Sequence, residues 1–190
     1  MPHHSLRKPL KSSDHKYSRG VVAVAAGTLK FPGAAILAVG GARHGGAGYV
    51  KFLSSQTRLA DLVVTTFPDV VPISDLRSQR YDSLVVGPGG ADLKKLPGLI
   101  PIVLDSAAIR HALKHRDGIT VVTPHEGELK YLGIKNTNFS ENERKEIAED
   151  LAKKLGVSVV LKGHRTVIAS AGNKTKIDTI GGAELSIAGS

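Results

Sequence analysis

The 190-residue chain is long enough for one domain, and its 41% hydrophobic content is ordinary for a globular protein. It has no cysteine, which excludes disulfides, thiolate metal sites and a cysteine nucleophile. The net charge of +9 keeps nucleic acid open as a minor alternative, but the aromatic content of 4% argues against base stacking, and a basic surface also suits an anionic small molecule.

The chain begins with a polar, basic segment. Residues 1–16 carry several basic side chains against a single aspartate, and we expect a flexible tail there, followed by one domain over residues 17–190. No stretch reaches the ~18 apolar residues of a membrane span, and no apolar segment of signal-peptide length begins the chain. We therefore expect a cytoplasmic protein that does not bind membranes.

Short runs rich in Val, Ile and Leu then predict strands. Several runs are continuous rather than alternating, which is typical of strands covered on both faces. In chain order the predicted strands are 21–26, 48–53, 61–66, 83–86, 101–104, 119–122, 157–161 and 166–169.

Helical patterns lie between these runs. Residues 33–43 are rich in alanine. Residues 141–155 open with the capping-box pair Ser140 and Glu143 and stop at Gly156. Alternating strands and helices imply right-handed βαβ units. The predicted fold is a doubly wound α/β domain, with a mostly parallel sheet and helices on both faces.

Ligands of such sheets bind beyond the carboxyl ends of the strands. The turn Gly87-Pro88-Gly89-Gly90 follows one predicted strand, and its glycines let the backbone approach an anion, although a simple tight turn is an equal alternative. Asp105 follows another strand. It would bind a ligand hydroxyl or a magnesium-bound water, or cap the next helix, and capping is the favoured interpretation.

The stretch from Thr123 combines a helix start with residues that a helix start does not need. Thr123 is expected as the N-cap, Pro124 as the first helical residue and Glu126 as the capping-box partner. His125 then falls at the second helical position, where the helix dipole disfavours imidazolium and a neutral ring can both donate and accept. Gly127 leaves room beside it, so we expect His125 to bind a ligand.

A basic turn follows the predicted strand 157–161. Lysine and arginine side chains bracketing a turn can hold phosphates, and a β-hairpin with solvated charges is the equal alternative. The turn consists of Lys162, Gly163, His164, Arg165 and Thr166.

These groups, in this order, resemble the ADP/ATP-dependent NAD(P)H-hydrate dehydratases, a branch of the ribokinase-like superfamily. The resemblance is carried by "VVGPGG", "PIVLDSAA", "VVTPHEGEL", "VVLKGHRTVIA" and "GGAELSIAGS", of which Thr-Pro-His-x-Gly-Glu is the most specific. It implies repair of hydrated NADH or NADPH: dehydration of the (S)-hydrate at the expense of ADP or ATP, with Mg²⁺ screening the phosphates. It also implies a homo-oligomer, by expectation a tetramer, and a separate epimerase in the same pathway.

The resemblance assigns roles to residues of this sequence. The residues implied to contact the hydrated nicotinamide nucleotide are Ala34, Ala35, Gly87, Gly89, Gly90, Asp105, His125 and Gly127. Those implied to hold the adenine nucleotide are Lys162, Gly163, His164, Arg165, Thr166 and Gly189.

The sequence departs from the family pattern at three places. Gly90 stands where the family's glycine loop has leucine, and Ala107 stands where a second carboxylate follows Asp105. The family continues from Ala-Gly-Ser into a Gly-Asp pair with the catalytic aspartate, whereas this sequence ends at Ser190. We therefore expect a C-terminally incomplete domain with reduced activity and assign no catalytic or metal-ligating residue. A ribokinase-like kinase of a small alcohol, such as a vitamin precursor, is the alternative.

Overall fold

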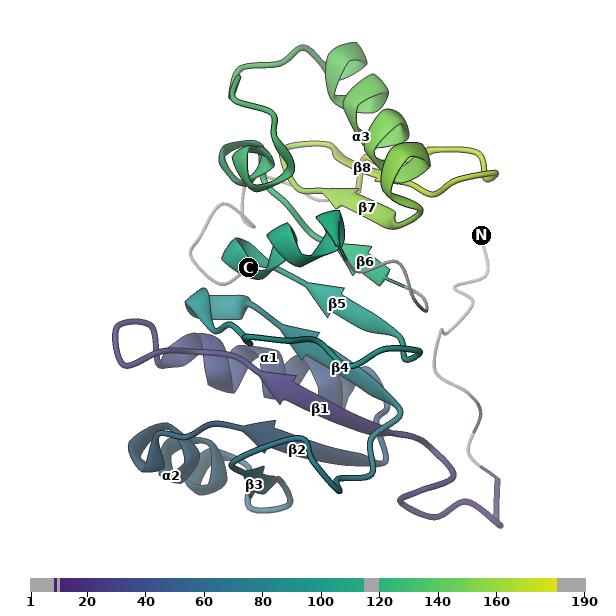
Figure 1. The fold of residues 1–190 in the computed structure, drawn as a ribbon. Coiled ribbons are helices and arrows are strands. Elements are labelled where there is room, and N and C mark those ends of the chain that lie inside the picture. Colours follow the sequence, from purple (N-terminus) through teal and green to yellow (C-terminus); the bar gives the residue numbers. More distant parts are fainter. Residues whose placement is uncertain (1–8, 10, 115–119, 181–190) are drawn as a thin grey trace.

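One sheet organises the computed structural model, which describes residues 9, 11–114 and 120–180 (Figure 1). In these residues nine strands lie in the order β3-β2-β1-β4-β5-β6-β7-β8-β9. The first seven strands in this order, from β3 to β7, pair in parallel. Strand β8 pairs antiparallel with both β7 and β9. The strands are β1 (Val21–Ala25), β2 (Tyr49–Leu53), β3 (Val71–Ile73), β4 (Ser83–Val86), β5 (Ile102–Leu104), β6 (Thr120–Val122), β7 (Ser158–Leu161), β8 (Thr166–Ala169) and β9 (Lys176–Asp178).

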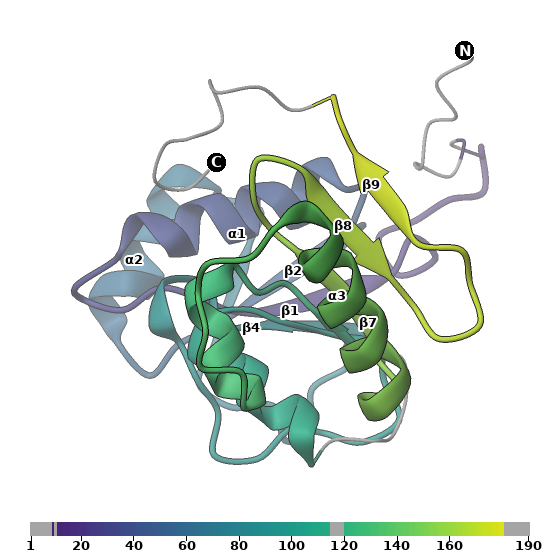
Figure 2. The ribbon, with the colours of Figure 1, turned by 90° about the horizontal axis from the view of Figure 1, so that it is seen from above.

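Helices cover both faces of this sheet, as predicted (Figure 2). On one face α1 and α2 pack against β1 and β2, and on the other η2, η3 and α3 pack against β4 to β8. Side chains of β1 enter both cores, because Ala23 and Ala25 belong to one cluster and Val24 to the other. The helices are α1 (Gly33–His44), α2 (Thr57–Thr66), α3 (Glu141–Leu155) and the 3₁₀ segments η1 (Pro88–Gly90), η2 (Ser106–Leu113) and η3 (Glu126–Leu132).

The predicted strand 61–66 is wrong, since these residues lie in α2. Leu59 and Val63, four residues apart, are buried against Val50 and Phe52 of β2. On a strand the side chain of Asp61 would face the same core as Leu59 and Val63, whereas on the helix it is exposed. Packing therefore overrides the strand preference of the β-branched residues.

Two edge strands were missed. Strand β3 contains Pro72, which lacks an amide donor and is tolerated at the edge of a sheet. Strand β9 has a partly buried Ile177 between two exposed residues at the opposite edge, and so short a run gives little periodic signal.

The strand order reverses between β1 and β4, and this is the topological switch point where open α/β sheets bind ligands. The turns after the two strands meet there, because the Gly27 amide donates to the Pro88 carbonyl at 2.7 Å. The predicted glycine turn therefore lies at the point of the sheet that favours a ligand.

The N-terminal segment is described only from residue 9, without residue 10. Near the end of this segment Lys16 lies against β2, with its ammonium 5.3 Å from the centre of the Tyr49 ring. Among the residues that the structure describes, none belongs to a helix with the length and apolarity of a membrane span.

Candidate functional site

The glycine turn is shaped by close approach to its neighbours. Gly87 has a φ of 124°, and a Cβ there would overlap the Asp105 carbonyl oxygen. Gly89 has a φ of 69°, and its Cβ would lie 2.5 Å from that of Ala34. Both positions therefore require glycine for conformation and for space, while Gly90 is exposed at the end of the turn.

The two alanines at the beginning of α1 separate in their roles. Ala35 is fully buried, and a Cβ on Gly27 would lie 2.8 Å from the Ala35 Cβ. Its side chain packs in the core, and its assignment as a substrate contact stays a prediction. Ala34 is partly exposed beside Gly89, so its assignment stays a prediction.

Asp105 does not cap the helix that follows it, contrary to the favoured interpretation. It occupies the N-cap position of η2, but its side chain makes no capping hydrogen bond. Its Oδ1 accepts from the Thr123 hydroxyl and from the Lys162 ammonium, each at 2.7 Å. Asp105 therefore connects the ends of three neighbouring strands, β5, β6 and β7.

The helix after β6 begins two residues later than predicted. The N-cap is His125, not Thr123, and the Glu128 carboxylate accepts from the His125 amide at 2.9 Å. The Thr123 hydroxyl instead donates to Asp105. The Pro124 carbonyl accepts from the amide of Lys162 at 2.7 Å, which continues the parallel pairing past the ends of β6 and β7. Pro124 is thus not the first helical residue, and the capping partner is Glu128 rather than Glu126.

The imidazole of His125 projects to the surface, with 58% of its side chain exposed. Its Nε2 lies 3.6 Å from Oε1 of Glu128. A Cβ on Gly127 would lie 2.9 Å from Cε1 of this ring, so Gly127 makes room for the histidine itself. The space that the absent side chain of Gly127 leaves is filled by the His125 ring.

The two cationic side chains of the basic turn after β7, Lys162 and Arg165, have different partners. The Lys162 ammonium points to Asp105 and lies 3.8 Å from Oε2 of Glu128, with 41% of the side chain exposed. Arg165 instead pairs with Glu141 of α3 at 3.1 Å. Gly163 and His164 are exposed, and the Thr166 hydroxyl donates to the Gly163 carbonyl at 3.4 Å. Gly189 lies outside the described residues.

These contacts form one group, the edge cluster, at the carboxyl ends of β5 to β7. His125 and Lys162 pair as an isolated parallel bridge, and Asp105 touches the Gly87 turn on its other side. Glu128 was missed by the sequence analysis, although its three-residue spacing from His125 is that of a capping box. The edge cluster consists of Asp105, Thr123, His125, Glu128 and Lys162.

A cavity of about 1040 Å³ lies along the carboxyl ends of β1, β2 and β3 and the segment after the glycine turn, and no residue of the edge cluster lines it. Gly27, Thr28 and Gly90 lie on its wall, and Lys94 and Lys95 are exposed there. These lysines were not predicted from the sequence, because they follow no strand directly.

Acidic side chains on the cavity wall are already paired. Asp75 binds Arg77, and Asp92 binds Arg110 and His111. Partial burial raises the pKa of Asp92, but hydrogen bonds from His111, the Leu93 amide and Arg110 outweigh it and hold the pKa below its ordinary value of 3.8. The wall thus presents cations more freely than carboxylates.

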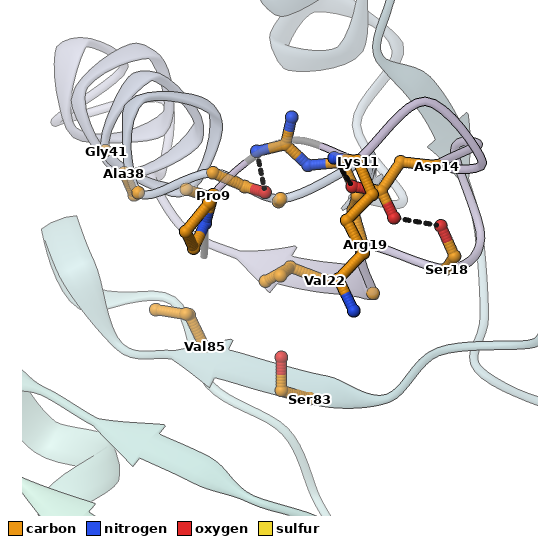
Figure 3. Close-up of a pocket in the computed structure, with 15 residues that line it drawn as sticks. Pro9, Lys11, Asp14, Ser18, Arg19, Val22, Ala38, Gly41, Ser83 and Val85 are labelled. Carbon is orange, nitrogen blue, oxygen red and sulfur yellow. Dashed lines mark hydrogen bonds between the residues drawn. The ribbon is translucent and has the colours of Figure 1, made fainter. Parts of the chain in front are cut away.

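A second cavity, of about 910 Å³, lies at the opposite ends of the strands (Figure 3). It exposes part of Val22 and Val85 beside Gly41 of α1. Polar groups on its wall are already used, since Arg19 donates to the Gly46 carbonyl at 3.1 Å and Asp14 accepts from Ser18 at 3.1 Å. This cavity is an open part of one sheet face, remote from the edge cluster.

In the described part of the chain, no three His, Asp or Glu side chains gather as metal ligands. The edge cluster offers an ammonium, an imidazole and carboxylates at the ends of neighbouring strands, which suits anionic and hydroxyl-bearing ligands.

The mostly parallel sheet with an antiparallel edge, and the glycine turn at its switch point, define a ribokinase-like α/β protein. A ribokinase-like superfamily protein of Enterococcus faecalis has the same fold, with a TM-score of 0.79 at 20% identity over 97% of this chain and 72% of that one. The ADP/ATP-dependent NAD(P)H-hydrate dehydratase of Bacillus subtilis, co-crystallised with ATP and Mg²⁺, gives a TM-score of 0.80 at 26% identity over 95% of this chain and 71% of that one.

The sequence identifies the family within this class. The family described as NAD(P)H-hydrate dehydratase matches residues 22–190, and the chain belongs to it. The chain is 32% identical over 192 residues to the bifunctional NAD(P)H-hydrate repair enzyme of Mycobacterium tuberculosis, covering 93% of this chain and 39% of that protein. It is 28% identical to the ADP-dependent (S)-NAD(P)H-hydrate dehydratase of Bacillus subtilis, covering 83% and 63%. The chain thus spans less than two thirds of the length of these relatives.

Proposed function

We propose that this chain dehydrates (S)-NAD(P)H hydrate to NAD(P)H at the expense of ADP or ATP. The observation that carries the proposal is the meeting of Gly87, Asp105, His125 and Lys162 at one edge of the sheet in a member of this family. The related Bacillus subtilis enzyme was crystallised with ATP and Mg²⁺, which supports an adenine nucleotide as the co-substrate.

The cavity beside the glycine turn is the proposed site of the hydrated dinucleotide. Its volume of about 1040 Å³ is at the upper end of ligand sites, which suits a dinucleotide. Lys94 and Lys95 on its wall supply positive charge for the dinucleotide's phosphates. The Gly87–Gly90 turn and His125 would then face the nicotinamide, whose amide and hydroxyl need both a donor and an acceptor.

Lys162 is the proposed contact for the terminal phosphates of the adenine nucleotide. Its side chain is 41% exposed, so the ammonium can turn from Asp105 toward a phosphate without unfolding the cluster. Asp105 would keep its hydrogen bond from Thr123. Its freed acceptor positions would then be available to the ring hydroxyl of the substrate or to a magnesium-bound water.

Phosphoryl transfer explains why a nucleotide is needed. The ring hydroxyl oxygen of the hydrate attacks the terminal phosphorus, the bond to the nucleotide breaks, and the hydroxyl proton is lost. The phosphate group of the resulting ester then leaves with the electron pair of the carbon–oxygen bond, the ring nitrogen supplies electrons, and loss of a ring proton restores NAD(P)H. Each turnover releases one phosphate and one shortened nucleotide.

The residues of the edge cluster fit the magnesium ion that accompanies such a nucleotide. Mg²⁺ is usually held by one or two carboxylates together with substrate phosphates and water. Asp105 and Glu128 are the carboxylates that would hold it, and the ion would screen the phosphate charge.

The proposal extends to partners and location. Because relatives of this chain are bifunctional repair enzymes, a separate epimerase is the proposed source of the (S)-hydrate. A homotetramer working in the cytoplasm, where these cofactors are used, completes the proposal. Size-exclusion chromatography with light scattering tests the tetramer, and a monomer at working concentration would contradict it.

Recovery of NADH tests the function. The chain is incubated with (S)-NADH hydrate, Mg²⁺ and either ADP or ATP, and we expect the near-ultraviolet absorbance of NADH to return only when a nucleotide is present. Phosphorylation of a small hydroxymethyl compound without this recovery would instead support a small-alcohol kinase. Salt-sensitive binding of DNA or RNA without nucleotide binding would support a nucleic-acid protein.

A further inference from the structure

Arg144 is a buried cation where a helix does not favour one. It lies in the first turns of α3 and is only 6% exposed. The beginning of a helix carries partial positive charge, which favours acidic residues such as Glu141 and Glu143 and disfavours a guanidinium. A buried charge also has to be paired or hydrogen-bonded. The position of Arg144 therefore depends on specific partners.

Those partners belong to the two segments that carry His125 and Lys162. Nη2 of Arg144 donates to the carbonyl oxygens of Leu161 at 3.2 Å and Lys162 at 3.1 Å. Its Nε lies 3.0 Å from Oε1 of Glu126, an ion pair whose alignment is too poor for a hydrogen bond. One side chain thus joins the end of β7 to the first residue of η3.

The guanidinium lies on the protein side of the candidate site. Only 8% of the Arg144 side chain is exposed, compared with 58% for His125 and 41% for Lys162. The backbones of His125 and Lys162 pair directly with each other, and Arg144 holds both segments from behind. Arg144 therefore binds the backbone of Lys162 directly and the segment of His125 through the side chain of the next residue, Glu126.

Gly163 is explained by the same guanidinium. A Cβ at this position would overlap Nη2 of Arg144 and lie 2.8 Å from its Cζ. Such a clash is tolerated at the end of a free side chain, but this guanidinium is held by three partners and cannot move without losing them. The glycine of the predicted phosphate turn is thus required by Arg144.

We propose that Arg144 is a positioning residue of the candidate site. It holds the Leu161 and Lys162 carbonyls and the Glu126 carboxylate together, and so fixes the distance between the Lys162 ammonium and the His125 ring. This inference rests on the proposed function, since that distance matters only if a nucleotide and the hydrated nicotinamide bind there together. Arg144 itself touches neither ligand.

Calorimetric binding of ADP with Mg²⁺ tests the proposal in the full chain. Arg144→Met keeps most of the packing volume, and we expect it to weaken ADP binding by about tenfold, the effect of misplacing one charged hydrogen bond. Arg144→Lys keeps the charge with a single donor head and should rescue binding in part. Lys145→Met likewise replaces a cationic side chain with methionine, at the exposed neighbouring position, and should leave ADP binding unchanged.

Gly163→Ala reaches the same contact while retaining every charge. It should weaken ADP binding in the native background and have no further effect in the Arg144→Met background, because the clashing guanidinium is then gone. This variant also keeps the test decisive if Arg144→Met does not fold. Native affinity in folded Gly163→Ala and Arg144→Met proteins would overturn the proposal.

Amide signals of the nucleotide-free protein separate this inference from the proposed function. In ¹H–¹⁵N spectra, Arg144→Met should shift the amides of His125 and Lys162, whereas Lys145→Met should not. Shifted amides in a chain that binds no ADP would mean that the proposed function fails and the positioning role with it. Unshifted amides in a chain that does bind ADP would overturn the positioning role alone.

Discussion

Lys162→Met separates a structural ion pair from a ligand contact, because the two roles predict effects of different size. Lys162 lies 2.7 Å from Asp105, but 41% of its side chain is exposed. A pair so well solvated contributes about 0.2–1 kcal/mol to stability. In a domain of this size the melting temperature should then fall by roughly 4 °C at most.

The effect on nucleotide binding should be larger. A hydrogen bond between an ammonium and a phosphate is worth about 1.5–3 kcal/mol, so the dissociation constant for ADP should rise roughly 10- to 150-fold. Titration calorimetry measures this constant, and circular dichroism follows the melting temperature. Lys174→Met is the matched control, since Lys174 is exposed in the turn between β8 and β9, at the opposite ends of the strands.

Two outcomes would refute this reasoning. Unchanged ADP affinity in folded Lys162→Met protein would mean that the lysine serves the pair with Asp105 alone. An equal loss of affinity in Lys174→Met would mean that general surface charge, and not the edge cluster, attracts the nucleotide.

Three further predictions follow from the same geometry. Gly87→Ala should lower the melting temperature by roughly 3–10 °C, because a φ of 124° and overlap with the neighbouring strand add about 1–3 kcal/mol of strain; an unchanged melting temperature would contradict it. His125→Ala should weaken binding of (S)-NADH hydrate more than binding of ADP in parallel titrations, and equal losses would count against its substrate role. The pKa of Asp92 lies below 3.8 in the folded chain, so its contribution to stability is present above pH 3.8 and is lost as the pH falls through the folded value. Urea unfolding at a series of pH values should therefore show a flatter acid limb for Asp92→Asn, and identical limbs would exclude this contribution.

The sequence predicted most of the fold because its signals were local. Continuous apolar runs gave the central strands, and the capping box at Ser140 with Gly156 at the other end gave α3 within its observed bounds. The segment from residue 61 was wrong because Leu59 and Val63 fit a helix only when β2 is there to receive them. Strand β3 was missed because Pro72 argues against a strand unless that strand lies at the edge of the sheet, and only the order of the strands shows that it does.

The sequence by itself determined that glycines, an aspartate, a histidine and a lysine follow separate strands, and the rule that strand ends share an edge placed them near one another. Only the tertiary structure decided which of them touch. Asp105 binds Lys162 and does not cap its own helix, and His125 rather than Thr123 is the N-cap of η3. Ala35 is buried in the core, and Arg144 of α3 binds the backbone of Lys162. The physical reason is that a hydrogen bond or an ion pair depends on distances across the sheet of a few ångströms, and the spacing of residues along the chain does not contain them.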